Sequence, residues 1–171
     1  MKKSYVYEEP YYFIEVVLVG ITSVVVLLIA LLLAIFYPIV PKELLLLLAV
    51  IAGYQSWNTF VSLSNPETVT ISDASISFSG FQRTHEYLIQ DIKTFLVRPF
   101  PSSGKTYVRI NKHGLLKGRY WVPTKMFCNG KELFDYLVDL EYKIHPNSIK
   151  AKARRVNTAY LMKKRSKNKN V

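Results

Sequence analysis

Residues 16–37 read VVLVGITSVVVLLIALLLAIFY, an apolar run of 22 residues without a charged side chain. As an α-helix this run would extend about 33 Å at about 1.5 Å per residue, which exceeds the roughly 30 Å hydrocarbon core of a bilayer. A chain of 171 residues has too little other protein to bury such a helix on all sides. The run therefore predicts a transmembrane helix over about residues 13–37.

A second uncharged run, LLLLLAVIAGYQSWNTFVSL, follows at residues 44–63. The connection between the two runs contains Pro38 and Pro41, which end one helix and allow the next to begin. Because this connection is short, the two helices must form a tight hairpin, and a second span is predicted over about residues 43–63. Acidic residues precede the first run and no clean cleavage site follows it, so we expect it to be retained rather than removed as a signal peptide.

Charge is divided unevenly along the chain. Residues 1–65 carry three Lys/Arg and four Asp/Glu, whereas residues 66–171 carry twenty and eight, so the two parts have net charges of −1 and +12. Two spans place both termini on one side, and the positive-inside rule assigns that side to the cytoplasm. We therefore expect a multi-pass protein of the plasma membrane with both termini cytoplasmic.

Polar side chains share one face of the second span. Gln55, Asn58 and Ser62 stand at positions i, i+3 and i+7 of a helix. They are candidates for helix packing, either through hydrogen bonds to the first span or as a docking face for a partner helix. Neither apolar run contains a charged residue, which gives transport chemistry little support.

Short alternating segments beyond residue 65 predict an antiparallel β-domain. They cover residues 68–72, 75–79, 85–90, 92–98, 105–111 and 119–123. One amphipathic helix follows, with Leu133, Leu137 and Leu140 on its apolar face and Lys131, Glu132, Asp135, Asp139 and Glu141 outside. We expect this helix to cap an open end of a sandwich or barrel.

This pattern is similar to the bacterial pleckstrin-homology-like (PH-like) domains, including YcxB-like membrane proteins, in which two spans often precede such a domain. The matching stretches are VTISDASISFSG (69–80), EYLIQDIKTF (86–95), and RYWVPTKMF with ELFDYLVDL (119–127 and 132–140). Val122-Pro123 and Phe127 fit the family's last strand. The resemblance covers about residues 66–142, between an N-terminal segment with the spans (1–65) and a basic tail (143–171). It implies a scaffold or binding module without catalytic residues.

No catalytic or metal-binding arrangement is evident in the sequence. The SGKT stretch at residues 103–106 is similar to the end of a phosphate-binding loop, but Pro99 stands where that motif needs a glycine, and strands are expected on both sides. The histidines His85, His113 and His145 are not at metal-ligand spacing. We therefore expect a protein that is not an enzyme and has no cofactor.

The chain ends in a basic tail that is predicted to be helical, because Ile149, Ala153, Val156 and Tyr160 would share one helical face. Residues 143–171 contain ten Lys/Arg and no acidic residue. We expect the tail to contact anionic lipid headgroups. The candidate residues are Lys150, Lys152, Arg154, Arg155, Lys163, Lys164 and Arg165. A tail that acts only as a topology signal is a further reading, and nucleic acid is disfavoured because the β-domain lacks an evident stacking motif.

These features predict a membrane-tethered binding or regulatory module whose β-domain recruits or senses a protein partner at the inner face of the membrane. The alternative is an accessory subunit of a membrane complex whose transmembrane helices make the functional contacts, including immunity-type protection. A soluble β-domain would keep the binding activity in the first case and lose it in the second.

Overall fold

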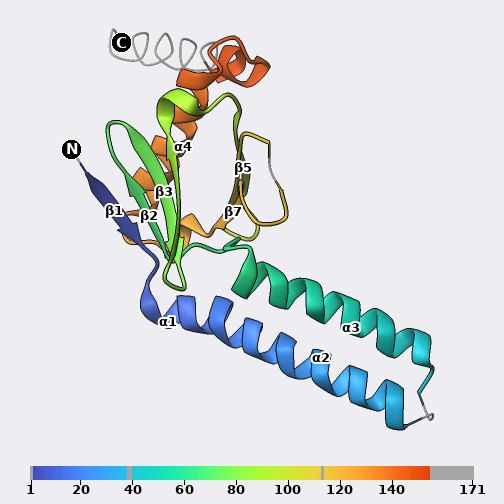
Figure 1. Cartoon of the computed structure of the whole chain (residues 1–171). Coiled ribbons are helices and arrows are strands. Elements are labelled where there is room, and N and C mark those ends of the chain that lie inside the picture. Colours follow the sequence, from blue (N-terminus) through green and yellow to red (C-terminus); the bar gives the residue numbers. More distant parts are fainter. Residues whose placement is uncertain (1, 38–39, 113, 155–171) are drawn as a thin grey trace, which may run out of the picture.

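The computed structural model describes residues 2–37, 40–112 and 114–154. Strand β1 (Lys3–Val6) is followed by two long helices that pack side by side as an antiparallel hairpin (Figure 1). The first helix consists of α1 (Glu9–Tyr12), a π-helical segment (Phe13–Leu18) and α2 (Val19–Phe36), and the second of α3 (Lys42–Ser56) and a π-helical segment (Trp57–Val61). Both are long and apolar enough to cross a membrane.

The two hairpin helices approach closely at Gly20. A Cβ added at Gly20 would lie 2.6 Å from Thr59 Cγ2 and 2.7 Å from Phe60 Cζ, well inside normal carbon–carbon contact. The missing side chain therefore lets the two helices pack this closely, as small residues do between membrane helices. At Gly53 the nearest atom to an added Cβ is a Leu27 methyl at 3.9 Å, which is an ordinary contact.

Two antiparallel sheets form the β-domain. The first sheet has the order β1-β2-β3-β4 and the second sheet the order β5-β6-β7. The strands are β2 (Thr68–Ile71), β3 (Ser75–Gly80), β4 (Arg83–Leu88), β5 (Phe95–Phe100), β6 (Lys105–Ile110) and β7 (Arg119–Val122). Single 3₁₀ turns cover Ile89–Asp91 and Thr124–Met126. The prediction of two apolar helices followed by antiparallel sheets is confirmed.

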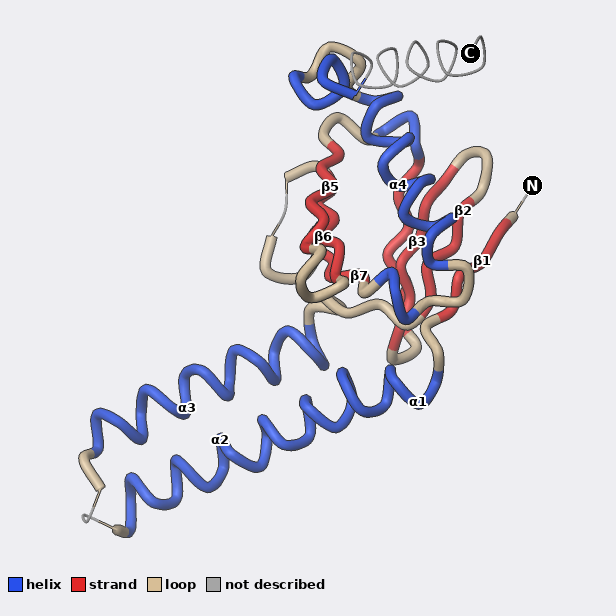
Figure 2. Tube along the Cα trace, turned by 180° about the vertical axis from the view of Figure 1, so that it is seen from behind, coloured by secondary structure: helices blue, strands red, loops and turns tan. Residues whose placement is uncertain are grey.

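Helix α4 (Gly130–Ile144) closes the opening between the two sheets (Figure 2). Its apolar residues Leu133, Leu137 and Leu140 are buried, as the helical pattern predicts. They pack with inward-facing residues of both sheets: Val69, Ile76, Phe78, Phe95, Val97, Val108, Ile110, Tyr120 and Val122. Burying each large aliphatic or aromatic side chain contributes about 1.5–3 kcal/mol, so this shared core holds the sheets and α4 together.

Strand β1 precedes the hairpin in the chain, yet it is the edge strand of the first sheet. It pairs antiparallel with β2, with Tyr5 opposite Val69. Tyr5 and Tyr7 are 3% and 1% exposed. The β-domain thus includes residues on both sides of the hairpin, whereas the sequence placed it after residue 65. A four-residue strand has too little alternation to be recognised, and its partner is distant in sequence.

The hairpin is fixed to the β-domain where it ends. The Trp121 N–H in β7 donates a hydrogen bond to the Ser64 carbonyl oxygen at 2.7 Å. The Arg83 guanidinium, at the start of β4, donates to the Val61 carbonyl oxygen at 3.0 Å. Both sheets therefore hold the end of the second hairpin helix, so the β-domain is not suspended from a free linker.

We expect Gly20→Ala to destabilise the hairpin, because the new methyl group must displace Thr59. Overpacking of this kind costs about 1–3 kcal/mol, which thermal unfolding of the detergent-purified protein measures as a lower melting temperature. Gly53→Ala is the matched control, since its methyl group meets only ordinary contacts, and the melting temperature should stay the same or rise. Equal melting temperatures for the two variants would contradict the close approach at Gly20.

Candidate binding groove beside strand β5

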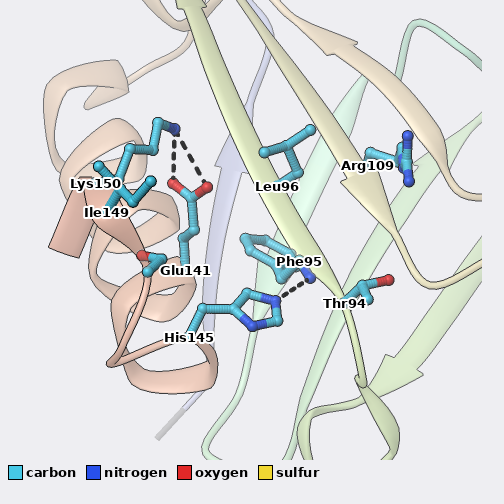
Figure 3. A pocket seen from close by; sticks show the side chains of 9 residues that line it. Thr94, Phe95, Leu96, Arg109, Glu141, His145, Ile149 and Lys150 are labelled. Atoms are coloured by element: carbon cyan, nitrogen blue, oxygen red, sulfur yellow. Dashed lines mark hydrogen bonds and ion pairs between the residues drawn. The ribbon is translucent and has the colours of Figure 1, made fainter.

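A groove lies where the chain leaves α4 and passes strand β5 (Figure 3). Its volume is about 430 Å³ and its surface is mostly apolar. The lining residues are Thr94, Phe95, Leu96, Arg109, Glu141, His145, Ser148, Ile149 and Lys150. Ile149 is 88% exposed, so an apolar side chain stands uncovered at the rim.

Strand β5 is an edge strand, because β6 is its single partner among the strands that the structure describes. Main-chain groups on its open side are met by side chains of the segment that follows α4. The Phe95 N–H donates to His145 Nε2 at 3.1 Å, and the Lys150 ammonium donates to the Val97 carbonyl oxygen at 2.5 Å. Pro99, two residues further along the same side, has no N–H to offer. Side chains therefore cover this edge in place of a strand.

Lys150 is held in position by a buried carboxylate. The Glu141 side chain is only 6% exposed, and its two oxygens accept hydrogen bonds from Lys150 at 3.1 and 3.2 Å. The expectation that Glu141 lies on the outer face of its helix is wrong, because the segment after α4 folds back over it. A buried carboxylate is costly without a partner, so this pair fixes the course of the chain along β5.

The edge of β1 is covered differently from the edge of β5. The Cys128 N–H donates to the Val6 carbonyl oxygen at 2.9 Å, so main chain meets main chain there. A second opening of about 510 Å³ lies between β1 and α4, where Lys3 forms an ion pair with Glu132. Of these two edges, the edge of β5 is the one that side chains cover.

The predicted lipid-contacting residues of the tail are only partly described. Lys150 lies in the groove, and Arg154 pairs with Asp139 at 2.9 Å while its guanidinium lies 4.8 Å from the centre of the Tyr142 ring. Lys152 is exposed. Arg155, Lys163, Lys164 and Arg165 lie outside the described residues. Carboxylates of helix α4 therefore form ion pairs with two of the three described basic residues of the tail.

Two polar residues of the second hairpin helix join a hydrogen-bonded group at its end. Ser62 Oγ lies 2.6 Å from Ser64 Oγ and 3.2 Å from the Asn58 carbonyl oxygen, and the Ser64 N–H donates to the same carbonyl at 3.3 Å. These bonds satisfy groups that a helix end leaves open. Gln55, one turn before Asn58, is half-buried.

A polar row inside the β-domain connects the two sheets, and sequence reasoning missed it. His85 Nδ1 lies 2.9 Å from the Tyr120 hydroxyl, which lies 2.6 Å from the Tyr87 hydroxyl. Burial, followed by the charges of Lys117 and Arg83, lowers the pKa of His85 from its ordinary value of 6.5. Burial also raises the pKa of Tyr120. The row joins β4 to β7 and belongs to the packing between the sheets.

The remaining candidates for chemistry are the SGKT stretch and clusters of possible metal ligands. The predicted hairpin loop between β5 and β6 is confirmed. Ser103 and Gly104 of the SGKT stretch lie in this turn, with Gly104 in the left-handed region at φ 66°, and Lys105 and Thr106 begin β6. Within residues 2–37, 40–112 and 114–154, no three His, Cys, Asp or Glu side chains gather closely enough to hold a metal ion.

No protein-family model matches this chain, and it has no match among curated proteins or solved structures.

We expect Lys150→Met to destabilise the protein by about 1–3 kcal/mol, because it leaves a buried carboxylate and a strand carbonyl without their partner. Thermal unfolding of the purified protein measures this loss. Lys152→Met is the matched control, since Lys152 is exposed two residues away, and it should change stability by less than about 0.5 kcal/mol. If both variants unfold alike, Lys150 does not hold this segment on β5.

His85 predicts a pH dependence of stability. Its pKa is lower in the folded protein than the ordinary 6.5, so the unfolded chain binds more protons as the pH falls below 6.5. The contribution of neutral His85 to the free energy of unfolding should therefore be fully present above this pH. It should decrease toward lower pH, with a slope of up to about 1.4 kcal/mol per pH unit. Denaturant unfolding across this range measures the slope.

His85→Gln is the variant that tests this dependence, because it keeps a hydrogen-bonding group beside the Tyr120 hydroxyl but cannot titrate. It should flatten the loss of stability on the acid side. An unchanged slope would assign the pH dependence to other groups.

Proposed function

We propose that this chain is a membrane-anchored, non-enzymatic binding module. In this proposal the hairpin crosses the plasma membrane, and a PH-like β-domain stands at its cytoplasmic face and engages a protein partner. The order of four strands, three strands and a closing helix supports the PH-like assignment. The surplus of Lys and Arg after residue 65 supports the cytoplasmic side.

The observation that carries the proposal is the cover over the edge of β5. An edge strand offers a row of main-chain groups to any extended chain that reaches it. Here His145 and Lys150 occupy two of these groups. An extended segment of a partner that displaced these two side chains would pair with β5 through its main chain, which is a common mode of peptide recognition.

The groove beside this edge would give the interaction its selectivity. Leu96 and Ile149 supply apolar surface and Arg109 supplies positive charge at the same groove. A partner segment that combines an apolar side chain with a nearby carboxylate would complement both features. Main-chain pairing would contribute affinity, and the groove would decide which segment binds.

The alternative is an accessory subunit of a membrane complex, including an immunity-type protein, in which the hairpin makes the functional contacts. Gln55, Asn58 and Ser62 are the polar residues that such an interface would use. Ser62 Oγ is hydrogen-bonded within the chain to Ser64 Oγ and to the Asn58 carbonyl oxygen, and Asn58 Oδ1 lies 3.5 Å from both serine hydroxyls. The use of Asn58 and Ser62 within the chain supports a partner that binds the β-domain.

Photo-crosslinking in cells that express the full chain tests the proposal. A benzoyl-phenylalanine at Thr94 or Ile149, which line the groove, should give a discrete protein adduct. The same residue at Ile29 or Leu48, which are exposed on the hairpin, should not. Adducts from the hairpin positions alone would favour the accessory subunit and contradict the groove.

A second arm of this experiment uses the cover itself. Lys150→Met removes the side chain that occupies the Val97 carbonyl and should increase the adduct from Thr94, because the edge of β5 becomes free to pair. Lys152→Met should leave the adduct unchanged. If neither variant changes its amount, the partner does not use this edge.

A further inference from the structure

The outer face of the second sheet carries positive charge and aromatic rings. The alternation of β5, β6 and β7 turns Arg98, Arg109 and Arg119 away from the core, whereas Val97, Val108 and Tyr120 are buried. From residue 95 to residue 122 the chain contains six Lys/Arg and no Asp or Glu. No carboxylate from these strands therefore offsets the charge of this face.

Aromatic side chains form a row on the same face. The Trp121 ring lies 4.9 Å from the Tyr107 ring and 5.4 Å from the Phe100 ring, measured between centroids. Trp121 and Phe100 are 37% and 41% exposed. Tryptophan and tyrosine beside Arg and Lys are typical of surfaces at the headgroup level of a membrane, because one end of each ring is apolar and the other is polar.

The loop before β7 adds two uncovered leucines. Leu115 and Leu116 are 65% and 51% exposed, with Lys117 beside them. Figures 1 and 2 show this loop on the side of the β-domain toward which the hairpin runs. Apolar side chains that protrude next to cations fit the boundary between headgroups and acyl chains.

The hairpin fixes which side of the β-domain meets the membrane. The Trp121 N–H is bonded to Ser64 at the end of the second helix, and the Lys105 ammonium lies 3.5 Å from the Glu15 carboxylate in the first. The second sheet is thus joined to both helices where their apolar stretches begin and end. A membrane crossed by the hairpin would lie beside the outer face of this sheet.

We propose that the outer face of the second sheet, together with Leu115 and Leu116, rests on the anionic lipid leaflet that the hairpin crosses. The leucines enter the headgroup boundary, and Arg98 and Arg119 contact lipid phosphates. This contact holds the already oriented β-domain against the leaflet and does not need the basic tail, whose Lys150 and Arg154 are paired with α4. The inference rests on the membrane anchoring proposed above but does not depend on the groove.

Fluorescence quenching in lipid nanodiscs tests the inference with the full chain. Cys128 is replaced by Ser, and a nitrobenzoxadiazole probe is attached to a cysteine at residue 115, at residue 135 on the exposed face of α4, or at residue 29 in the hairpin. The discs contain phosphatidylcholine with or without phosphatidylglycerol. A shallow spin-labelled lipid quenches probes at the headgroup level, and a lipid with the spin label deep in its acyl chain quenches the probe at residue 29. The probe at residue 29 reports insertion of the hairpin, so failed anchoring is distinguished from failed docking.

We expect the probe at residue 115 to be quenched in discs with phosphatidylglycerol and the probe at residue 135 to stay unquenched. Raising the salt from about 0.1 to about 1 M shortens the screening length from about 10 to about 3 Å and should reduce the quenching. Quenching at residue 29 with none at residue 115 would overturn the proposal and leave this face open for a protein.

Charge reversal assigns the contact to particular residues. Arg98→Glu with Arg119→Glu should lower the docked-to-free ratio about 25-fold, because each of the two basic residues near an anionic leaflet contributes about a factor of five. Lys131→Glu with Lys143→Glu, the same charge change on α4, should have little effect. Melting temperatures verify that both double variants fold. If removal of residues 155–171 abolishes the quenching while the arginine reversals do not, the tail holds the domain and the proposal fails.

Discussion

The pairing of β1 with β2 is the constraint on which the rest of the structure depends. The chain leaves the first sheet after β1, forms the hairpin, and returns to the adjacent strand, where the Tyr7 N–H donates to the Glu67 carbonyl oxygen at 2.8 Å. Adjacent antiparallel strands require the ends of the hairpin to be close together. The packed hairpin in turn brings β1 to β2, so the two parts reduce the entropic cost of each other's formation.

This arrangement makes the orientation of the β-domain a property of the fold. A domain on a flexible linker can turn any face toward a surface, whereas this one is held by β1 on one helix and by Ser64 and Val61 at the end of the other. The basic outer face of the second sheet therefore has a fixed orientation relative to the hairpin. The composition shows an excess of Lys and Arg, but only this geometry shows where on the surface these residues lie.

The predictable part of the structure is the part with a local period. The uncharged runs, the alternating segments and the stripe of Leu133, Leu137 and Leu140 all appear in the structure as helices, strands and a buried helix face. Strand β1 was not predicted, because four residues are too few to show an alternation of apolar and polar side chains and because its partner β2 follows the hairpin in the sequence. Glu141 was placed outside because its burial depends on Lys150, which arrives from the next segment and leaves no periodic signal.

Basic residues of similar appearance in the sequence have different roles in space. Lys150 and Arg154 belong to the tail that composition marks for lipid, yet both are paired with carboxylates of α4. Arg98 and Arg119 lie in strands, where the sequence shows only alternation, and they extend from the outer face of the second sheet. If that face rests on the leaflet, the groove opens along its β5 edge, where Leu96 and His145 lie. In the binding proposed above, a segment that paired with β5 would then run close to the membrane surface.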